Sequence, residues 1–134
     1  MYEYALREIH AGRKQTHWMW FIFPQLRGLG SSHTADFFGI SGEAEARAYL
    51  DHPVLRQRLE ACCDALLTHT NLPARAIFGH PDDLKLHSSV TLFACVAEPG
   101  SVFAEVIDHF FDGKPDDRTL AMLRAEGEPT NEGG

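Results

Sequence analysis

The chain has 134 residues, which is enough for one domain to bury a hydrophobic core without disulfide or metal staples. Apolar residues make up 44% and charged residues 23%, as in ordinary soluble proteins, and no apolar run approaches the roughly 20 residues that cross a bilayer. Residues 1–34 hold four Arg or Lys and two acids, a charge of +2; the whole chain has a net charge of −7, so residues 35–134 carry −9. This acidic balance argues against a nucleic-acid polymer as partner.

The N-terminus and the cysteines indicate a cytoplasmic protein. The first residues have neither the cationic nor the apolar region of a secretory signal. Three cysteines, of which Cys62 and Cys63 are adjacent, make no disulfide framework and fit a reducing compartment. Cys62 falls on an apolar helical stripe and Cys95 in an apolar stretch, so both are predicted to be small core residues. No membrane partner is expected.

Helix signals begin at the N-terminus. An apolar stripe predicts a helix over residues 2–11 that ends at Gly12. Thr16 is expected to cap a short helix over residues 18–23, which Pro24 stops. A strand is the competing interpretation of this aromatic stretch, but no other segment offers such a strand a partner.

The middle of the chain alternates loops and caps. Residues 28–32 are expected to form a loop in which a serine caps a short helix through residues 37–38. Ser41 is predicted to cap a helix over residues 43–50. The longest helix is expected to follow, with Pro53 at its first helical position.

The C-terminal half continues the pattern. Further helices are expected over residues 73–78, 81–96, 102–111 and in a last segment that ends at residue 127. Ser101 is predicted to cap the third of these, and Asp116 or Asp117 the last. Residues 128–134 are polar and rich in glycine and are expected to be disordered. The sequence therefore predicts a single all-α domain over residues 1–127, with about seven or eight helices.

Metal and phosphate-loop motifs are weak in this chain. Eight histidines are scattered without the spacing of a metal site, so surface or capping histidines are the preferred interpretation and no metal and no cofactor is expected. Gly28 and Gly30 follow no strand and match no nucleotide-binding loop. Their backbone N–H groups could still form an anion nest, although a plain loop is the better interpretation.

Lys85, Ser88 and Ser89 form a second polar cluster. If the segment is helical, the three side chains share one face, where they could hold a phosphate or a carboxylate. In the alternative, each serine bonds back to the carbonyl four residues earlier and the lysine is solvated. From this cluster alone the second interpretation is preferred.

Residues 11–30 contain both tryptophans beside cations, a histidine and a glutamine, and they closely resemble the bacterial domain-of-unknown-function family 1810. Residues 48–55, 77–79 and 85–93 are similar to the other blocks of that family. The resemblance implies a compact, all-helical protein without a settled activity. Some relatives are labelled calpastatin, an extended inhibitor that this cap-rich, apolar sequence does not resemble. Members usually begin before the position of Tyr2, so this chain is expected to lack one helix, and Val90 stands where methionine is more frequent.

The polar members of these blocks suit an anion-recognising pocket, because they combine a guanidinium fork, ammonium groups, an amide and stacking rings. We expect a small anionic ligand of nucleotide or ADP-ribose type. The residues expected to bind it are Arg13, Lys14, Trp18, Trp20, Gln25, Ser88 and Ser89. If the ligand is also hydrolysed, His17 is expected to carry the proton and Lys85 to stabilise charge, with Asp82 or Asp83 orienting a water.

Two other hypotheses compete with this pocket. The aromatic face of residues 18–23 could anchor a protein partner without any catalysis. Alternatively the segment is only core, and Arg13 and Gln25 merely satisfy helix ends. A loose similarity of residues 50–55 and 78–79 to a helical family proposed to act on ADP-ribose favours the ligand, but the acidic residue of such a hydrolase has no clear counterpart here.

Overall fold

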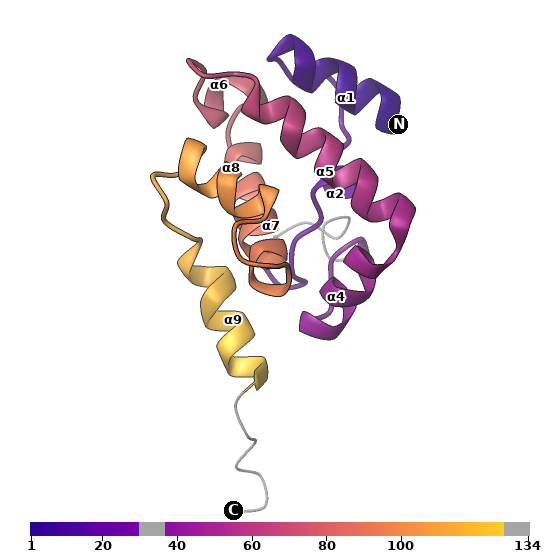
Figure 1. Ribbon diagram of the computed structural model, residues 1–134, viewed down its shortest axis with the longest axis vertical. Coiled ribbons are helices and arrows are strands. Elements are labelled where there is room, and N and C mark those ends of the chain that lie inside the picture. The colour runs from indigo at the N-terminus through magenta and orange to yellow at the C-terminus, as the bar shows by residue number, and fades with distance from the viewer. Residues whose placement is uncertain (30–36, 128–134) are drawn as a thin grey trace, which may run out of the picture.

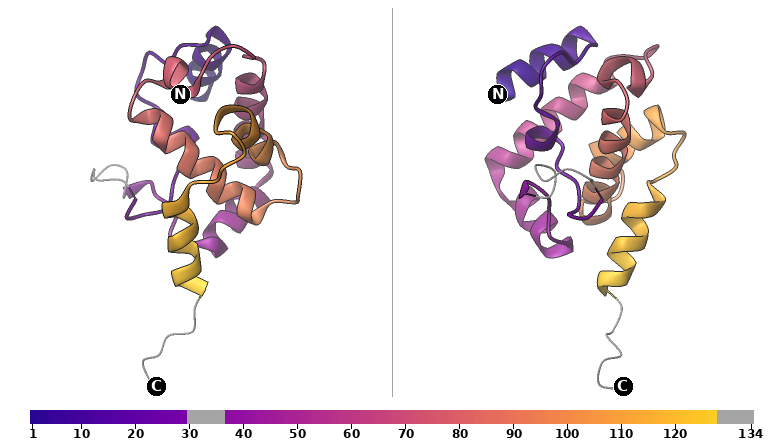
Figure 2. Two further views of the ribbon diagram at one scale, coloured as in Figure 1. Left: turned by 90° about the vertical axis from the view of Figure 1, so that its left-hand side faces the viewer. Right: turned by 180° about the vertical axis from the view of Figure 1, so that it is seen from behind.

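In the computed structural model, which describes residues 1–29 and 37–127, α1 (Tyr2–Ala11) packs across one end of the molecule against α5 (Pro53–Leu67). At the opposite end α9 (Asp117–Gly127) packs against α7, and its C-terminal end points away from the other helices (Figure 1; Figure 2). The remaining helices are α2 (Met19–Ile22), α4 (Glu43–Asp51), α6 (Ala74–Phe78), α7 (Asp82–Val96) and α8 (Val102–Phe110). The described residues form these eight helices and no sheet, so the predicted all-α class is confirmed.

The central helix is α7, which packs against α4, α6, α8 and α9. Every residue from Ser88 to Phe93 is buried, as expected of a helix that is surrounded on all sides. The ring of Phe93 lies 5.1 Å from that of Tyr49 in α4 and 5.8 Å from that of Phe103 in α8. Even so, no helix in the described part of the chain has the length and apolar character to cross a membrane.

Most predicted helix ends are confirmed. Gly12 ends α1 in the left-handed conformation, with φ of 78°, and Pro53 is the first residue of α5. The Ser101 hydroxyl accepts a hydrogen bond of 3.3 Å from the backbone of α8. Of the two candidates at α9, Asp116 is the cap, since its carboxylate accepts from the Thr119 N–H at 3.0 Å. The predicted serine cap in residues 31–32 and the predicted disorder of residues 128–134 lie outside the described residues.

Two predicted caps are wrong. Thr16 does not cap α2, because its hydroxyl donates instead to the Glu8 carboxylate at 2.7 Å, and a charged acceptor makes the stronger bond. At α4 the N-cap position belongs to Gly42, and the Ser41 hydroxyl donates to Glu45 at 3.4 Å. Both hydroxyl groups therefore donate a hydrogen bond to a carboxylate, and neither accepts one from a free N–H at the start of a helix.

The cysteines divide between core and surface. Cys62 and Cys63 are buried and unbonded in α5, and burial raises the pKa of the Cys62 thiol to about 12. Cys95 is exposed, which corrects its prediction as a core residue. The reason is the direction of its side chain in the last turn of α7, where the neighbouring Ala94 and Val96 pack against the core and Cys95 faces outward.

Three histidines make tertiary hydrogen bonds to carbonyl groups, a role beyond the expected surface or cap positions. His69 donates to the Ile9 carbonyl at 2.6 Å and so joins the end of α5 to α1. His87 of α7 donates to the Lys114 carbonyl at 2.6 Å, and His109 of α8 donates to the His69 carbonyl at 2.9 Å. These bonds fix the helix ends relative to one another.

Candidate functional site

The aromatic segment is divided between the core and the surface. Trp18 is fully buried and packs edge-on against Phe78, with ring centroids 6.1 Å apart. Trp20 is half-buried, and Phe21 is 43% exposed. Within this segment, a ligand can therefore reach Trp20 but not the ring of Trp18.

Glu8 holds the chain between α1 and α2 in place. Its carboxylate accepts hydrogen bonds from the backbone of Gln15 at 2.7 Å, from the backbone and hydroxyl of Thr16 at 3.0 and 2.7 Å, and from the Trp18 indole at 2.9 Å. Burial alone would raise the pKa of Glu8, but these donors outweigh it and lower the pKa to about 2. Sequence reasoning missed this residue, because an acid on the polar side of an amphipathic helix has no distinguishing local signal.

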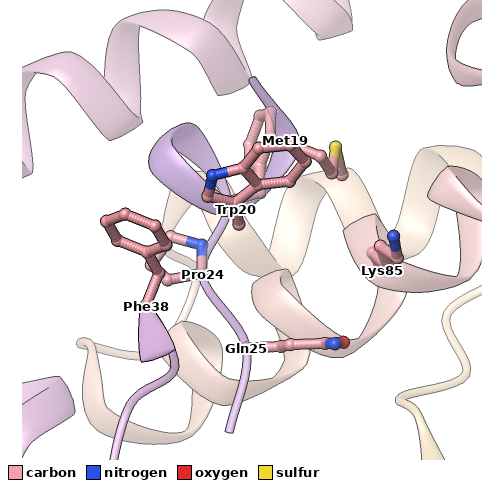
Figure 3. A pocket seen from close by; sticks show the side chains of 7 residues that line it. Met19, Trp20, Pro24, Gln25, Phe38 and Lys85 are labelled. Atoms are coloured by element: carbon pink, nitrogen blue, oxygen red, sulfur yellow. The ribbon is translucent and has the colours of Figure 1, made fainter. Parts of the chain in front are cut away.

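A cavity of about 50 Å³, which we call the slot, opens between α2, the segment after it, and α7. Figure 3 shows the rings of Trp20, Pro24 and Phe38 on one side of it, and the Gln25 amide and the Lys85 amine on the other. Its complete lining in the described residues is Met19, Trp20, Phe23, Pro24, Gln25, Phe38 and Lys85. The slot therefore combines aromatic walls with one polar edge.

Gln25 is the most informative group of the polar edge. Its backbone is fixed, since its carbonyl accepts from the Ile40 N–H at 2.9 Å. The residue is only 8% exposed, and its amide makes no hydrogen bond within the described residues; because Gln25 lines the slot, the amide is open to a bound molecule. A donor or acceptor of such a molecule would pair with the amide there.

The charges beside the slot are unequal. The Asp82 carboxylate lies 3.0 Å from the Lys14 ammonium and 3.3 Å from the Lys85 ammonium. The Lys14 side chain is only 8% exposed, whereas that of Lys85 is 34% exposed and lines the slot. One carboxylate thus serves two cations and leaves one positive charge unbalanced in this group, which favours an anion at Lys85.

Two larger hollows adjoin the slot. A hollow of about 430 Å³, the aromatic groove, shares Trp20, Pro24 and Phe38 with the slot. Its other walls are Phe21, Ile40, Glu45, Ala48, Tyr49, His52 and Leu55. The groove adds stacking faces to the aromatic side of the slot.

The other neighbour, the cationic hollow, has a volume of about 180 Å³ and shares Gln25 and Lys85 with the slot. Its other walls are Leu29, Pro81, Leu84, Ser88 and Arg118. Arg118 comes from α9, and sequence reasoning missed it because nothing in the sequence indicates that α9 packs beside α7.

Five of the predicted site residues lie in the slot or beside it. Trp20, Gln25 and Lys85 line the slot, Lys14 shares Asp82 with Lys85, and Ser88 lines the cationic hollow. The Ser88 hydroxyl also bonds back to the carbonyl of the residue four positions earlier at 3.2 Å, as the alternative for this helix anticipated.

The other predicted residues are not brought there. Arg13 is exposed and does not line the slot, and His17 lines a different, open hollow with Met1, Tyr4 and Thr16. Trp18 is in the core, and Ser89 is fully buried with a hydroxyl that has no partner within the described residues.

The acids proposed to orient a water both have polar partners. Asp82 binds the two lysines, and Asp83 lies 2.9 Å from His80. In the part of the chain that the structure describes, no group of three or more His, Cys, Asp or Glu side chains is placed to hold a metal ion. The amine, amide, hydroxyl and guanidinium groups that are present match the donors used to bind anions.

Comparisons with known proteins agree with this architecture. A family model described as "Protein of unknown function (DUF1810)" matches residues 1–123. The crystal structure of the conserved hypothetical protein Rv1873 from Mycobacterium tuberculosis is similar, with 46% sequence identity and a TM-score of 0.89. The match covers 92% of this chain and 88% of that one. No curated protein matches the sequence.

Proposed function

The chain belongs to the DUF1810 family, whose description names no activity, and from the site itself we propose that it binds a small anionic ligand of nucleotide or ADP-ribose type. The observation that carries this proposal is the polar edge of the slot. There the amide of Gln25, which makes no hydrogen bond within the described residues, and the ammonium of Lys85 face rings that include Trp20. An anion and a planar group on one ligand would satisfy both sides.

The size of the cavities decides how such a ligand would lie. Ligand pockets usually measure about 300–1,000 Å³. The slot, at about 50 Å³, is too small for a whole nucleotide, but the aromatic groove beside it offers about 430 Å³. We therefore place the planar ring in the groove, against faces such as Trp20 and Tyr49, and the anionic part beside Lys85.

Binding, rather than hydrolysis, is the part of the function that the slot supports. His17 lines another hollow, and Asp82 is held by two lysines. Lys85 alone remains both in the slot and suited to stabilise developing negative charge. As compartment we propose the cytoplasm, because the adjacent Cys62 and Cys63 are buried as thiols in the core, a usage typical of reducing conditions.

The protein-interaction alternative keeps only part of its surface. Trp18, Met19, Ile22 and Phe23 are buried, so the face of residues 18–23 cannot act as one exposed patch. The hydrogen-bonding edge formed by Gln25 and Lys85 is also unexplained by a purely apolar contact. Ligand binding therefore accounts for more of the site.

The first test is titration of the protein with AMP, NAD and ADP-ribose, followed by thermal melting and tryptophan fluorescence. A ligand at 100 times its dissociation constant stabilises the folded state by about 2.7 kcal/mol, a shift of several degrees for a domain of this size. Because Trp20 lines the slot and the groove, we also expect a change in its emission, which Trp20→Phe removes.

Matched variants identify the site in this titration. Lys85→Ala should weaken binding by at least about tenfold, since an ion pair with the ligand is lost, whereas Lys114→Ala, at an exposed lysine, should not. Ser89→Ala should leave the affinity unchanged, because its hydroxyl is sealed in the core. Equal affinities of the wild type and Lys85→Ala, or no shift with any of the three ligands, would contradict the proposal.

A further inference from the structure

We propose that the cationic hollow is a phosphate subsite, in which Arg118 of α9 and Ser88 of α7 join Lys85 in holding a phosphate group of the ligand. The inference rests on the proposed function, and it adds a ligand class: nucleoside phosphates in preference to the corresponding nucleosides. It also gives α9, which packs at one end of the molecule, a direct role in recognition (Figure 1).

The first argument is continuity of the walls. Gln25 and Lys85 line both the slot and the cationic hollow, so a group beside the Lys85 ammonium can contact both cavities. Ser88 and Arg118 also line the cationic hollow. A ligand whose ring occupies the aromatic groove would therefore direct its anionic end toward these two side chains.

The second argument is the state of Arg118. Its guanidinium makes one long hydrogen bond, 3.4 Å, to the carbonyl of Leu29. No carboxylate within the described ranges lies in ion-pair distance of it, so its charge is not neutralised by a direct pair there. A guanidinium fork that is bound this weakly can turn toward a phosphate and form two parallel bonds with it.

The third argument concerns the hydrogen-bond donor in the cationic hollow and the carboxylate next to it. The Ser88 hydroxyl shares its proton between the Leu84 carbonyl at 3.2 Å and the Asp116 carboxylate at 3.3 Å, which are both long bonds for a hydroxyl. Asp116 brings a negative charge next to Ser88, but the same oxygen already accepts from the N–H and the hydroxyl of Thr119, at 3.0 and 2.6 Å. Ser88 is therefore the donor that can rotate to a phosphate, while Asp116 stays bound to α9.

The fourth argument is that a phosphate would balance the charge. The group formed by Lys14, Asp82 and Lys85 leaves one positive charge, and Arg118 adds a second, of which the Asp116 carboxylate beside Ser88 offsets one. A phosphate monoester carries between one and two negative charges at neutral pH. A nucleoside without phosphate would occupy the groove and leave the remaining positive charge without an anionic partner.

The experiment is calorimetric titration of the full chain with AMP, ADP-ribose, adenosine and inorganic phosphate. In the wild type we expect AMP to bind at least about tenfold more tightly than adenosine, because phosphate pairs with the cations. Arg118→Ala should remove most of this difference and leave the adenosine affinity unchanged. Arg118→Lys keeps the charge without the fork and should retain part of the preference.

Arg124→Ala is the matched control, because Arg124 is an exposed arginine on the same helix and lies outside the cationic hollow. It should bind AMP like the wild type, and thermal melting of all variants verifies that α9 remains folded. If Arg118→Ala keeps the full preference for AMP while Lys85→Ala loses it, the subsite is overturned and the slot survives. If neither AMP nor ADP-ribose binds the wild type, both proposals fail together.

Discussion

At the scale of single residues, the Glu8 carboxylate determines how the chain enters the site. Replacing Glu8 with alanine leaves the buried indole N–H of Trp18 without an acceptor and removes three further hydrogen bonds. An unpaired buried donor costs about 1–3 kcal/mol, so we expect Glu8→Ala to lower the free energy of unfolding by about 3 kcal/mol. Urea denaturation followed by tryptophan fluorescence measures this loss, and Glu3→Ala on the exposed side of the same helix is the control.

The same residue makes the stability depend on pH. The folded-state pKa of Glu8, about 2, lies below its ordinary value of 4.5, so ionised Glu8 stabilises the fold above that ordinary value. This contribution is lost as the pH falls from about 4.5 through about 2, and the difference in unfolding free energy between wild type and Glu8→Ala should shrink over that range. A difference that stays constant from about pH 6 to about pH 3 would show that Glu8 titrates normally when folded.

Single residues of the site differ in how far the sequence reveals them. Gln25 and Lys85 stand out because each is a polar side chain next to apolar residues, a contrast that is visible locally. Arg118 has no such signal, since its relevance depends on the packing of α9 beside α7. The sequence likewise does not decide whether Trp18 is buried, because its hydrogen-bond partner Glu8 lies on a different segment, helix α1.

At the scale of elements, the start of α9 depends on its cap. One Asp116 oxygen accepts from the Thr119 N–H and hydroxyl and from the Ser88 hydroxyl. We expect Asp116→Ala to lower the free energy of unfolding by about 1–2 kcal/mol, because the first turn of α9 loses its cap. Asp117→Ala, at the first helical position and with no side-chain hydrogen bond to another described residue, should cost less. Equal losses in thermal melts of the two variants would indicate a general charge effect rather than a cap.

The boundaries of these elements were predictable wherever the signal is local. Gly12, Pro53 and Ser101 act through their own backbone geometry or a hydrogen bond within one turn, and their helices begin or end as the sequence predicts. Thr16 and Ser41 failed as predicted caps because a glutamate offers each hydroxyl a charged acceptor. Tertiary contacts therefore override local capping where a carboxylate is within reach.

At the scale of the whole molecule, α7 connects helices that lie at opposite ends of the fold (Figure 2). Phe93 is fully buried between Tyr49 of α4 and Phe103 of α8, and removing its ring leaves a cavity that these neighbours cannot fill. Phe93→Ala should therefore lower the free energy of unfolding by about 3–5 kcal/mol, a large part of the 5–15 kcal/mol usual for a domain.

The way in which this variant unfolds tests the single domain. If all described helices share one core, far-ultraviolet circular dichroism and tryptophan fluorescence should report the same transition. In Phe93→Ala both signals should shift to lower urea, although the tryptophans lie in another part of the molecule. Phe37→Ala is the control, because Phe37 is 71% exposed and its loss should change stability by no more than about 0.5 kcal/mol. Two separate transitions, or equal midpoints for the two variants, would show that α7 does not hold the fold together as one cooperative unit.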